Sequence, residues 1–376
     1  MVIGLMGFGT IGAGVYEIIK ERSLAEVRYV LDIREIGIPE LTHSIDDLLN
    51  DSEVDTVVEV MGGLHPAYEF VTAALKAGKN VVTANKYLVA TFYDELIGLA
   101  KENNVAFRCT AAVGGGIGWL TALERAKRAE KITALEGIMN GTTNYILTNM
   151  HEKGLSFYAA LAEAQALGYA EADPSADIDG LDIMHKLMLS ANVAFDVSVE
   201  REELPVYGIR NLRDEDVKAF KDRGLTCKIL GRAFEKDGAV AAFVQPTLLE
   251  AGSMTASVPS NFNLISYDAE RSGRMSFYGQ GAGRYPTAAN VVQDCVDIKE
   301  GVKDFYSEKS EKIHLDNSCV SYRYYIRSTA ESAKPLCKKP FGVGYLTDLM
   351  SVAEMQKHME KIKAEDDKVF IAALSE

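Results

Sequence analysis

A glycine-rich turn at the start of the chain is the feature that most constrains its fold. The segment MVIGLMGFGTIGAGVYEIIK places Gly7, Gly9 and Gly12 in GxGxxG spacing, between a short apolar run and a helical pattern. This spacing suits a dinucleotide, because the glycines permit a tight turn, close approach of the backbone to a pyrophosphate, and close helix–strand packing. The phosphates then face the positive end of the helix, at Thr10 and Ile11.

The spacing alone is weak evidence for a nucleotide site, because a glycine-rich turn also forms in proteins that bind no nucleotide. Strand-like and helical runs alternate after it, among them DTVVEVMGG, PAYEFVTAALKAG and KNVVTAN. Such alternation predicts an α/β fold with a doubly wound parallel sheet. The run VRYVLD ends in Asp32, about where a ribose-binding acid belongs. We therefore expect residues 1–115 to form a dinucleotide-binding Rossmann domain.

Composition limits the partners of the chain. Its 376 residues are enough for two or three domains, and a net charge of −14 argues against a nucleic-acid partner, which needs a basic face. No apolar run approaches the roughly 18 residues of a membrane span. Five cysteines without a CxxC pair argue against a disulfide framework or a zinc site. The first strand begins at Val2 and leaves no room for a signal peptide, so we expect a cytoplasmic protein.

Three further segments are candidates for ligand binding, each with a structural alternative. Lys86 follows the strand-like run NVVTA, and ligands bind at the carboxyl ends of strands in open α/β sheets, although a solvated turn lysine is commoner. The glycines at 114–116 permit close approach of backbone to a ligand or ion, or else form a hinge. The turn YGQGAG at 278–283 either meets a ligand or only packs tightly.

The stretch EADPSADIDGLDIMHK, residues 171–186, is dense in carboxylates and leads into a largely apolar helix. A helix of that kind is buried. Asp182 and Lys186 are spaced i, i+4 and share one face of it. On an exposed helix such a pair contributes only ~0.2–0.5 kcal/mol, whereas a lysine on a buried helix tends to be functional. Composition leaves both the surface pair and the active-site pair open.

Together these segments resemble the homoserine dehydrogenase family, from Met1 to about Val296. The blocks GFGTIGAGV, VVEVMGG, TANK, NGTTNYIL and YG-x-GAG-x-x-PTA occur in the family's order. The family signature is matched in register at Ala164, Gly168, Tyr169, Ala170, Asp173, Pro174, Asp177, Gly180, Asp182 and Lys186. The resemblance implies NAD(P)-dependent interconversion of L-homoserine and L-aspartate 4-semialdehyde in threonine, methionine and isoleucine biosynthesis. It also implies a homodimer.

The resemblance implies a role for individual residues. Lys186 corresponds to the acid–base lysine and Asp182 to its partner carboxylate. Glu171 corresponds to the residue that binds the substrate's α-ammonium group. Asp177 lies on the same substrate loop, where it either contacts substrate or fixes the loop. The cofactor-side lysine, also counted as catalytic, falls on Lys86. Gly281, in the YGQGAG turn, completes the cofactor contacts.

The family also binds a monovalent cation such as Na⁺ through backbone carbonyls. The matching positions are Thr110, Val113, Gly115 and Ile117. Thr110 stands where a glutamate is common in the family. The ligand is the backbone carbonyl, which does not depend on the side chain, so this change is compatible with cation binding. Gly118 stands where a proline usually follows, and this change loosens the turn. Gln280 likewise replaces a usual proline.

Cofactor choice depends on Asp32, because a carboxylate there accepts hydrogen bonds from both ribose hydroxyls and repels a 2′-phosphate. This favours NAD over NADP. Arg34 either pairs with a phosphate, which would favour NADP, or neutralises Asp32.

The rest of the chain is expected to form a second, mixed α/β domain and a tail. Residues 116–300 carry catalysis and dimerisation, with 276–300 returning to the cofactor site. Residues 317–376 are predicted as strand, helix and strand, an incomplete ACT-like unit. Two other functions remain open. One is a related dehydrogenase for another small amino aldehyde, and the other is a catalytically silent nicotinamide-binding regulator.

Overall fold

The computed structural model describes residues 1–302 and 311–375. The chain divides into two compact units. The first consists of Met1–Ala129, Asn192–Ser198 and Gly279–Glu311, and the second of Glu130–Ala191, Val199–Tyr278 and Lys312–Glu376. The first unit thus extends past residue 115, where the sequence suggested a boundary, to residue 129. It also includes a later segment of the chain that begins at residue 279. Among the described residues, none of the helices combines the length and the apolar character that crossing a membrane requires.

The first unit is built on a sheet of six parallel strands in the order β3-β2-β1-β4-β5-β6. This is the order of dinucleotide-binding folds, and it confirms the predicted doubly wound sheet. All four residues of β4 are buried, as expected for a strand with both faces covered. The strands are β1 (Val2–Met6), β2 (Glu26–Leu31), β3 (Leu41–Thr42), β4 (Thr56–Glu59), β5 (Asn80–Thr83) and β6 (Phe107–Arg108).

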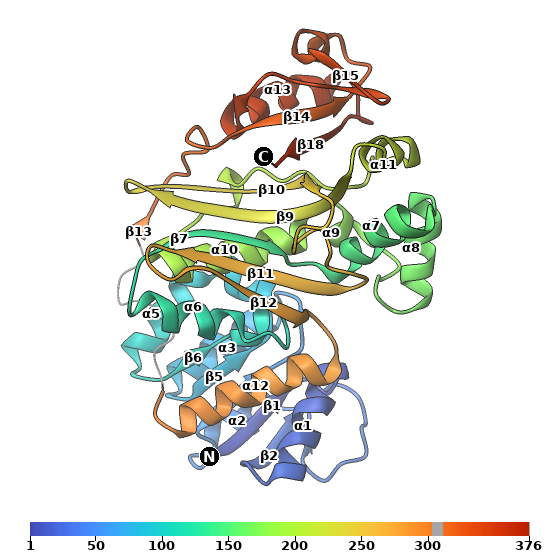
Figure 1. Cartoon of the computed structure of the whole chain (residues 1–376). Coiled ribbons are helices and arrows are strands. Elements are labelled where there is room, and N and C mark those ends of the chain that lie inside the picture. The colour runs from blue at the N-terminus through green and yellow to red at the C-terminus, as the bar shows by residue number, and fades with distance from the viewer. Residues whose placement is uncertain (303–310, 376) are drawn as a thin grey trace. The chain divides into compact units, whose positions relative to one another are not determined.

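A helix from much later in the chain completes the core of the first unit. Helix α12 (Arg284–Lys299) lies beside α1 (Thr10–Arg22) in Figure 1. A Cβ atom on Gly14 of α1 would lie 3.0 Å from the Ala288 side chain, so the two helices pack closely. The remaining helices are α2 (Ile45–Asn50), α3 (Ala67–Lys76), α4 (Lys86–Thr91), α5 (Tyr93–Glu102), α6 (Trp119–Lys127) and the 3₁₀ helix η1 (Thr110–Ala112).

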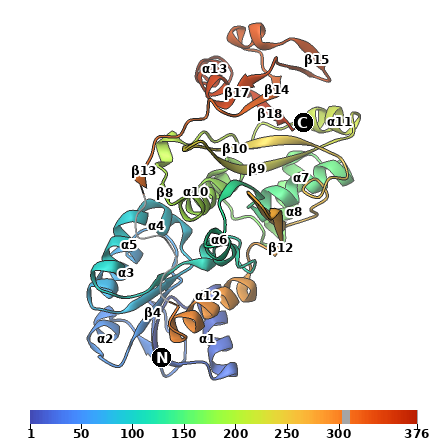
Figure 2. The same ribbon diagram turned by 60° about the vertical axis from the view of Figure 1, so that its left-hand side comes forward.

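The second unit is built on a mixed sheet whose centre is the antiparallel pair β9 (Leu225–Lys236) and β10 (Ala239–Glu250), which run side by side in Figure 2. Strands β7 (Ile132–Ile138), β11 (Phe262–Ala269) and β12 (Gly273–Gln280) continue it on the β9 side. The mixed α/β character expected of this part is confirmed. Its helices are α7 (Gly141–Lys153), α8 (Phe157–Ala166), α9 (Ser175–Ile178), α11 (Asp214–Lys221), η2 (Arg201–Glu203) and α10 (Leu181–Phe195), whose last residues, from Asn192, are counted with the first unit. The short strand β8 (Val197–Ser198) belongs to the first unit, and the two residues of β13 (Glu311–Lys312) fall on either side of the division.

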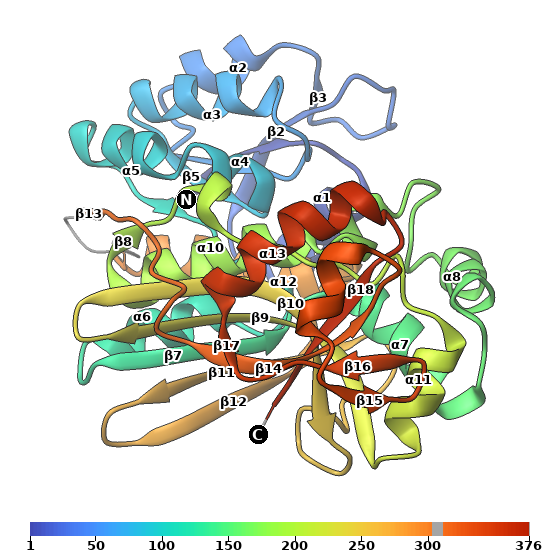
Figure 3. The ribbon, with the colours of Figure 1, turned by 90° about the horizontal axis from the view of Figure 1, so that it is seen from above.

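The tail contains more elements than the predicted strand, helix and strand, so that prediction was wrong. Its main strands run in the order β18-β14-β16-β15, and β16 and β15 lie side by side in Figure 3. With the 3₁₀ helix η3 counted as a helix, the element order is the βαββαβ of a ferredoxin-like unit. The elements are β14 (Ser321–Arg327), η3 (Glu331–Leu336), β15 (Lys339–Phe341), β16 (Gly344–Leu346), β17 (Met350–Ser351), α13 (Val352–Glu365) and β18 (Phe370–Leu374).

The tail is integrated into the second unit. Strand β18 pairs in parallel with β10, so the tail strands extend the main sheet. Helix α13 buries Met355, Met359 and Ile362 against Tyr324 of β14 and Ile371 of β18. The final residue of the predicted tail, at position 376, lies outside the described residues.

Candidate active site

The glycine turn of the first unit has the geometry that its spacing predicts. Gly7 adopts a φ of 94°, which L side chains rarely adopt. A Cβ atom on Gly12 would lie 2.0 Å from the Gly7 carbonyl oxygen, so only glycine permits this approach of helix to turn. Gly9 caps α1 without a side-chain hydrogen bond, and a Cβ there would meet nothing within 4 Å. Gly9 thus has open space on its missing side-chain side, directly before Thr10 and Ile11 at the N-terminus of α1, the end of a helix that attracts anions.

Asp32 follows β2 and is held against this turn. Its carboxylate accepts a 2.8 Å hydrogen bond from the backbone N–H of Phe8. The Arg34 guanidinium donates to both of its oxygens, at 2.9 and 2.8 Å, and also to the Phe8 carbonyl at 3.0 Å. These bonds hold the pKa of Asp32 well below its usual range. Arg34 thus pairs with Asp32, while its exposed guanidinium keeps open both uses considered for it, neutralising the acid and pairing with a phosphate.

A buried acid that the sequence analysis did not select stands at the end of β4. Glu59 is fully buried, and its carboxylate accepts hydrogen bonds from the Thr83 hydroxyl at 2.5 Å and the Met61 N–H at 2.8 Å. Burial raises its pKa. An acid inside the apolar run VVEV was a signal that could have found it. After the next strand, β5, Asn85 caps α4 and places Lys86 as the first residue of that helix.

The predicted cation ligands lie on the segment from η1 to α6, with the YGQGAG turn against it. The Gly116 N–H donates to the Gln280 carbonyl at 3.2 Å, and a Cβ on Gly115 would lie 2.6 Å from the Gly281 carbonyl oxygen. Asn290 of α12 donates to the carbonyl of Gly115. The turn at 279–283 is therefore packed onto the glycine run.

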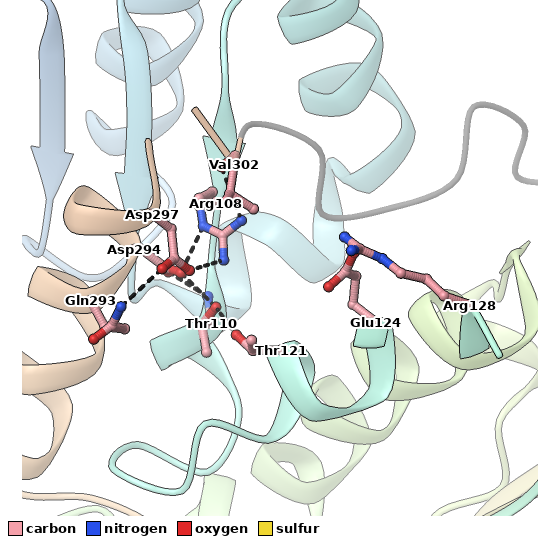
Figure 4. A network of polar contacts seen from close by, with 9 residues as sticks. All are labelled: Arg108, Thr110, Thr121, Glu124, Arg128, Gln293, Asp294, Asp297 and Val302. Carbon is pink, nitrogen blue, oxygen red and sulfur yellow. Dashed lines mark hydrogen bonds and ion pairs between the residues drawn. The ribbon is translucent and has the colours of Figure 1, made fainter. Parts of the chain in front are cut away.

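Thr110 is fixed by a buried polar network, drawn in Figure 4. Its N–H and hydroxyl both donate to Asp294 of α12, at 2.8 and 2.6 Å. Arg108 donates to the same carboxylate at 2.9 Å and to Asp297 at 2.7 Å. Thr110, at the position where the resemblance led us to expect a glutamate, thus joins η1 to α12 through its side chain.

Gly118 explains a departure from the family pattern. Its φ is 67°, at the N-cap of α6. Proline is confined to φ near −65°, so this backbone excludes the proline that the family resemblance led us to expect there. Val113 and Ile117 lie on the same turn, and the Ile117 N–H donates to the Gly114 carbonyl at 2.8 Å. Among residues 1–302 and 311–375, no three His, Cys, Asp or Glu side chains gather as a metal site.

In the second unit, α10 carries the lysine–aspartate pair. Lys186 donates to Asp182 Oδ2 at 2.7 Å, and the two side chains are only 10% and 8% exposed. Lys186 also donates to the Met139 carbonyl at 2.7 Å, at the end of β7. In a surface pair both side chains would be largely exposed, so the structure excludes the surface pair. A buried, hydrogen-bonded ammonium is a candidate acid–base group.

Asn140 is a second residue that the sequence analysis missed. Its amide nitrogen donates to Asp177 Oδ1 at 2.6 Å and to Asp182 Oδ2 at 2.8 Å. In the sequence it stands only as the first residue of the block NGTTNYIL, without a role of its own. Its contacts lie 37 and 42 residues along the chain, so no local pattern indicates them.

The two other acids of the loop differ in environment. Burial raises the pKa of Asp177, and the neighbouring carboxylate of Asp182 raises it further. Glu171 is exposed, and among the described residues its carboxylate has no recorded partner. Its backbone carbonyl accepts a 3.0 Å hydrogen bond from Gln165, which anchors the loop. Glu171 is therefore available to a ligand, while Asp177 is held from within the protein.

The sheet order, the glycine turn and the lysine–aspartate pair define a dinucleotide-dependent oxidoreductase. Two family descriptions match the chain, "Homoserine dehydrogenase, NAD binding domain" over residues 7–110 and "Homoserine dehydrogenase" over residues 119–296. The chain belongs to the homoserine dehydrogenase family. It is accordingly an enzyme that uses NAD(P) and interconverts L-homoserine and L-aspartate 4-semialdehyde.

Individual relatives agree with this assignment. The homoserine dehydrogenase of Bacillus subtilis is 38% identical over 80% of this chain and 73% of its own length. The crystal structure of a homoserine dehydrogenase from Thiobacillus denitrificans has a TM-score of 0.86 at 31% identity, over 100% of this chain and 98% of that one. A hyperthermophilic archaeal homoserine dehydrogenase in complex with NADPH has a TM-score of 0.70 at 26% identity, over 80% and 98%.

Proposed function

We propose that Lys186 is the acid–base group of this reaction and that Asp182 keeps it charged and oriented. Reduction of the aldehyde adds a hydride to carbon and a proton to oxygen, and NAD(P)H supplies the hydride when bound. The Lys186 ammonium then gives its proton to the oxygen, and in the reverse direction the neutral amine takes it back. The observation that carries this proposal is the buried 2.7 Å contact between Lys186 and Asp182.

Three other residues are proposed to complete the site. Glu171 binds the substrate's α-ammonium group, supported by its exposed carboxylate without a partner among the described residues. Asp177 lies on the substrate side of the loop. Lys86 is the cofactor-side lysine, supported by its place at the start of α4, directly after the carboxyl end of β5.

For the cofactor we propose contacts from Gly7, Gly9, Thr10, Ile11, Gly12 and Gly281, with Asp32 on the ribose and Lys86 nearby. NAD is slightly favoured over NADP. Asp32 supports NAD because its carboxylate is ionised and lies against the glycine turn. Arg34 opposes this choice, since an exposed guanidinium that leaves Asp32 could bind a 2′-phosphate.

Three finer features are also proposals. The carbonyls of Thr110, Val113, Gly115 and Ile117 would hold a monovalent cation such as Na⁺. The chain forms a homodimer, supported by the edge strand β12, which exposes Met275 and Tyr278. The enzyme is cytoplasmic.

An assay of turnover tests the function and separates the alternatives. Homoserine is offered with NAD and with NADP, and the same assay is repeated with the analogue lacking the α-amino group. We expect turnover with homoserine and a large loss with the analogue. Equal turnover of the two compounds would favour a dehydrogenase for another small aldehyde. Binding of the nicotinamide cofactor without any turnover would favour the silent regulator.

A further inference from the structure

We propose that Asn140 is a positioning residue that holds Asp182 and Asp177 ionised and in register beside Lys186. This inference rests on the function proposed for Lys186 and Asp182, and it adds a residue for which no role was assigned.

The amide of Asn140 has only one possible orientation. Asn140 lies between β7 and α7, is 4% exposed, and caps α7 by accepting the Thr143 N–H at 2.8 Å. Since that N–H needs an acceptor, the oxygen of the amide must face the helix. The two hydrogens on the nitrogen are then directed to Asp177 at 2.6 Å and Asp182 at 2.8 Å. Helix α7 thereby fixes a double donor between two carboxylates.

The same bonds organise the acid–base pair. Asp182 Oδ2 accepts from both Asn140 and Lys186, at 2.8 and 2.7 Å. Lys186 is bound in addition to the carbonyl of Met139, the residue before Asn140. Two consecutive residues at the end of β7 thus hold the ammonium and the carboxylate from the same side.

The charges around Asn140 show why a neutral double donor is needed. Asp177 on α9 is acted on by Asp182 and Lys186, both on α10. Lys228, a buried cation on β9, is directed instead to Asn144 and the Val258 carbonyl. Asp177 and Asp182 are thus two carboxylates beside the Lys186 ammonium, and like charges in a buried site favour uptake of a proton. Hydrogen bonds from Asn140 stabilise both ionised forms without adding charge.

The test is Asn140→Asp, which keeps an acceptor for the Thr143 N–H but replaces the donor by a third carboxylate. The dependence of kcat on pH is measured for homoserine oxidation at saturating substrate. We expect the acidic limb to move up by at least about one pH unit, because added negative charge raises the pKa of whichever group titrates. Turnover at pH 7 should fall by roughly tenfold or more, while KM for the nicotinamide cofactor stays within about twofold.

A smaller variant covers the case in which Asn140→Asp fails to fold. Asn140→Ser keeps a capping oxygen and adds no charge, so its acidic limb should lie between those of wild type and Asn140→Asp. The matched control is Ser156→Asp, which alters the N-cap of α8 and should leave the limb in place. A lower melting temperature with an unmoved limb in Asn140→Ser would overturn the inference and leave Asn140 only a capping role. Failure of the proposed function is separate, since it would appear as normal turnover in a Lys186 variant.

Discussion

Lys186 and Asp182 lie one turn apart on α10, joined by a 2.7 Å hydrogen bond, and each side chain is about nine-tenths buried. An isolated charge in such a place is costly, whereas a neutral pair of similar volume is tolerated. Replacing one partner should therefore reduce both stability and turnover. Replacing both by neutral residues should reduce turnover but leave most of the stability.

The first prediction uses this difference. Lys186→Met should lower turnover by at least ~10²-fold, the low end for lost acid–base catalysis. It should also lower the free energy of unfolding by ~3–5 kcal/mol, because Asp182 is left as an uncompensated buried charge. Adding Asp182→Asn should recover most of the stability and none of the turnover. Initial rates and urea unfolding measure the two effects, and near-normal turnover in either variant would exclude Lys186 from the chemistry.

A second prediction concerns Glu171. Shortening it in Glu171→Asp should raise KM for homoserine more than it lowers kcat, because the carboxylate then reaches the α-ammonium group less well while Lys186 is untouched. Glu215→Asp, an exposed acid in the first turn of α11, is the matched control and should change neither constant. An unchanged KM in Glu171→Asp would remove Glu171 from substrate binding.

The sequence predicted the part of the fold that is specified by local sequence patterns. Gly7 and Gly12 identify the turn because their spacing follows from backbone sterics, and the strand–helix alternation after them determines the sheet. The tail lacked such a signal: β15 and β16 have three residues each, too few to show alternation, and a 3₁₀ helix replaces the first helix.

The candidate site divides in the same way. The i, i+4 spacing placed Asp182 and Lys186 on one face, but only packing shows that this face is buried. Asn140 could be recognised as a turn residue, whereas its bonds to Asp177 and Asp182 depend on how β7 meets α9 and α10. The role of a residue that acts through long-range hydrogen bonds therefore cannot be predicted from local sequence patterns.

The third prediction concerns cofactor choice. In Arg34→Ala, both oxygens of Asp32 lose their guanidinium donor and become available to the ribose hydroxyls. We expect the ratio of kcat/KM for NAD to that for NADP to rise by about tenfold, mostly through loss of NADP efficiency.

Both cofactors must be compared at one salt concentration, because exposed charges are screened. Arg22→Ala, in the last turn of α1, controls for the change in net charge and should leave the ratio unaltered. A ratio that is unchanged in Arg34→Ala would mean that Arg34 serves only as the partner of Asp32.

The last prediction is a pH dependence of stability that originates at Lys228. This side chain is 2% exposed, and its ammonium donates to the Asn144 amide oxygen and the Val258 carbonyl, both at 2.7 Å. Burial lowers its pKa to about 8, from 10.5. Below pH 8 the folded and unfolded states both hold the proton. Between pH 8 and 10.5 the unfolded state holds it more firmly, so stability due to this group should rise with pH, by about 3 kcal/mol in total.

Lys228→Met removes the titration. The free energy of unfolding of wild type minus that of Lys228→Met should therefore increase from pH 7.5 to 9.5, as measured by urea unfolding. Lys218→Met, an exposed lysine on α11, should give a flat difference. If the Lys228→Met difference is equally flat, the Lys228 ammonium keeps an ordinary pKa in the fold and its neutral partners suffice to hold the charge.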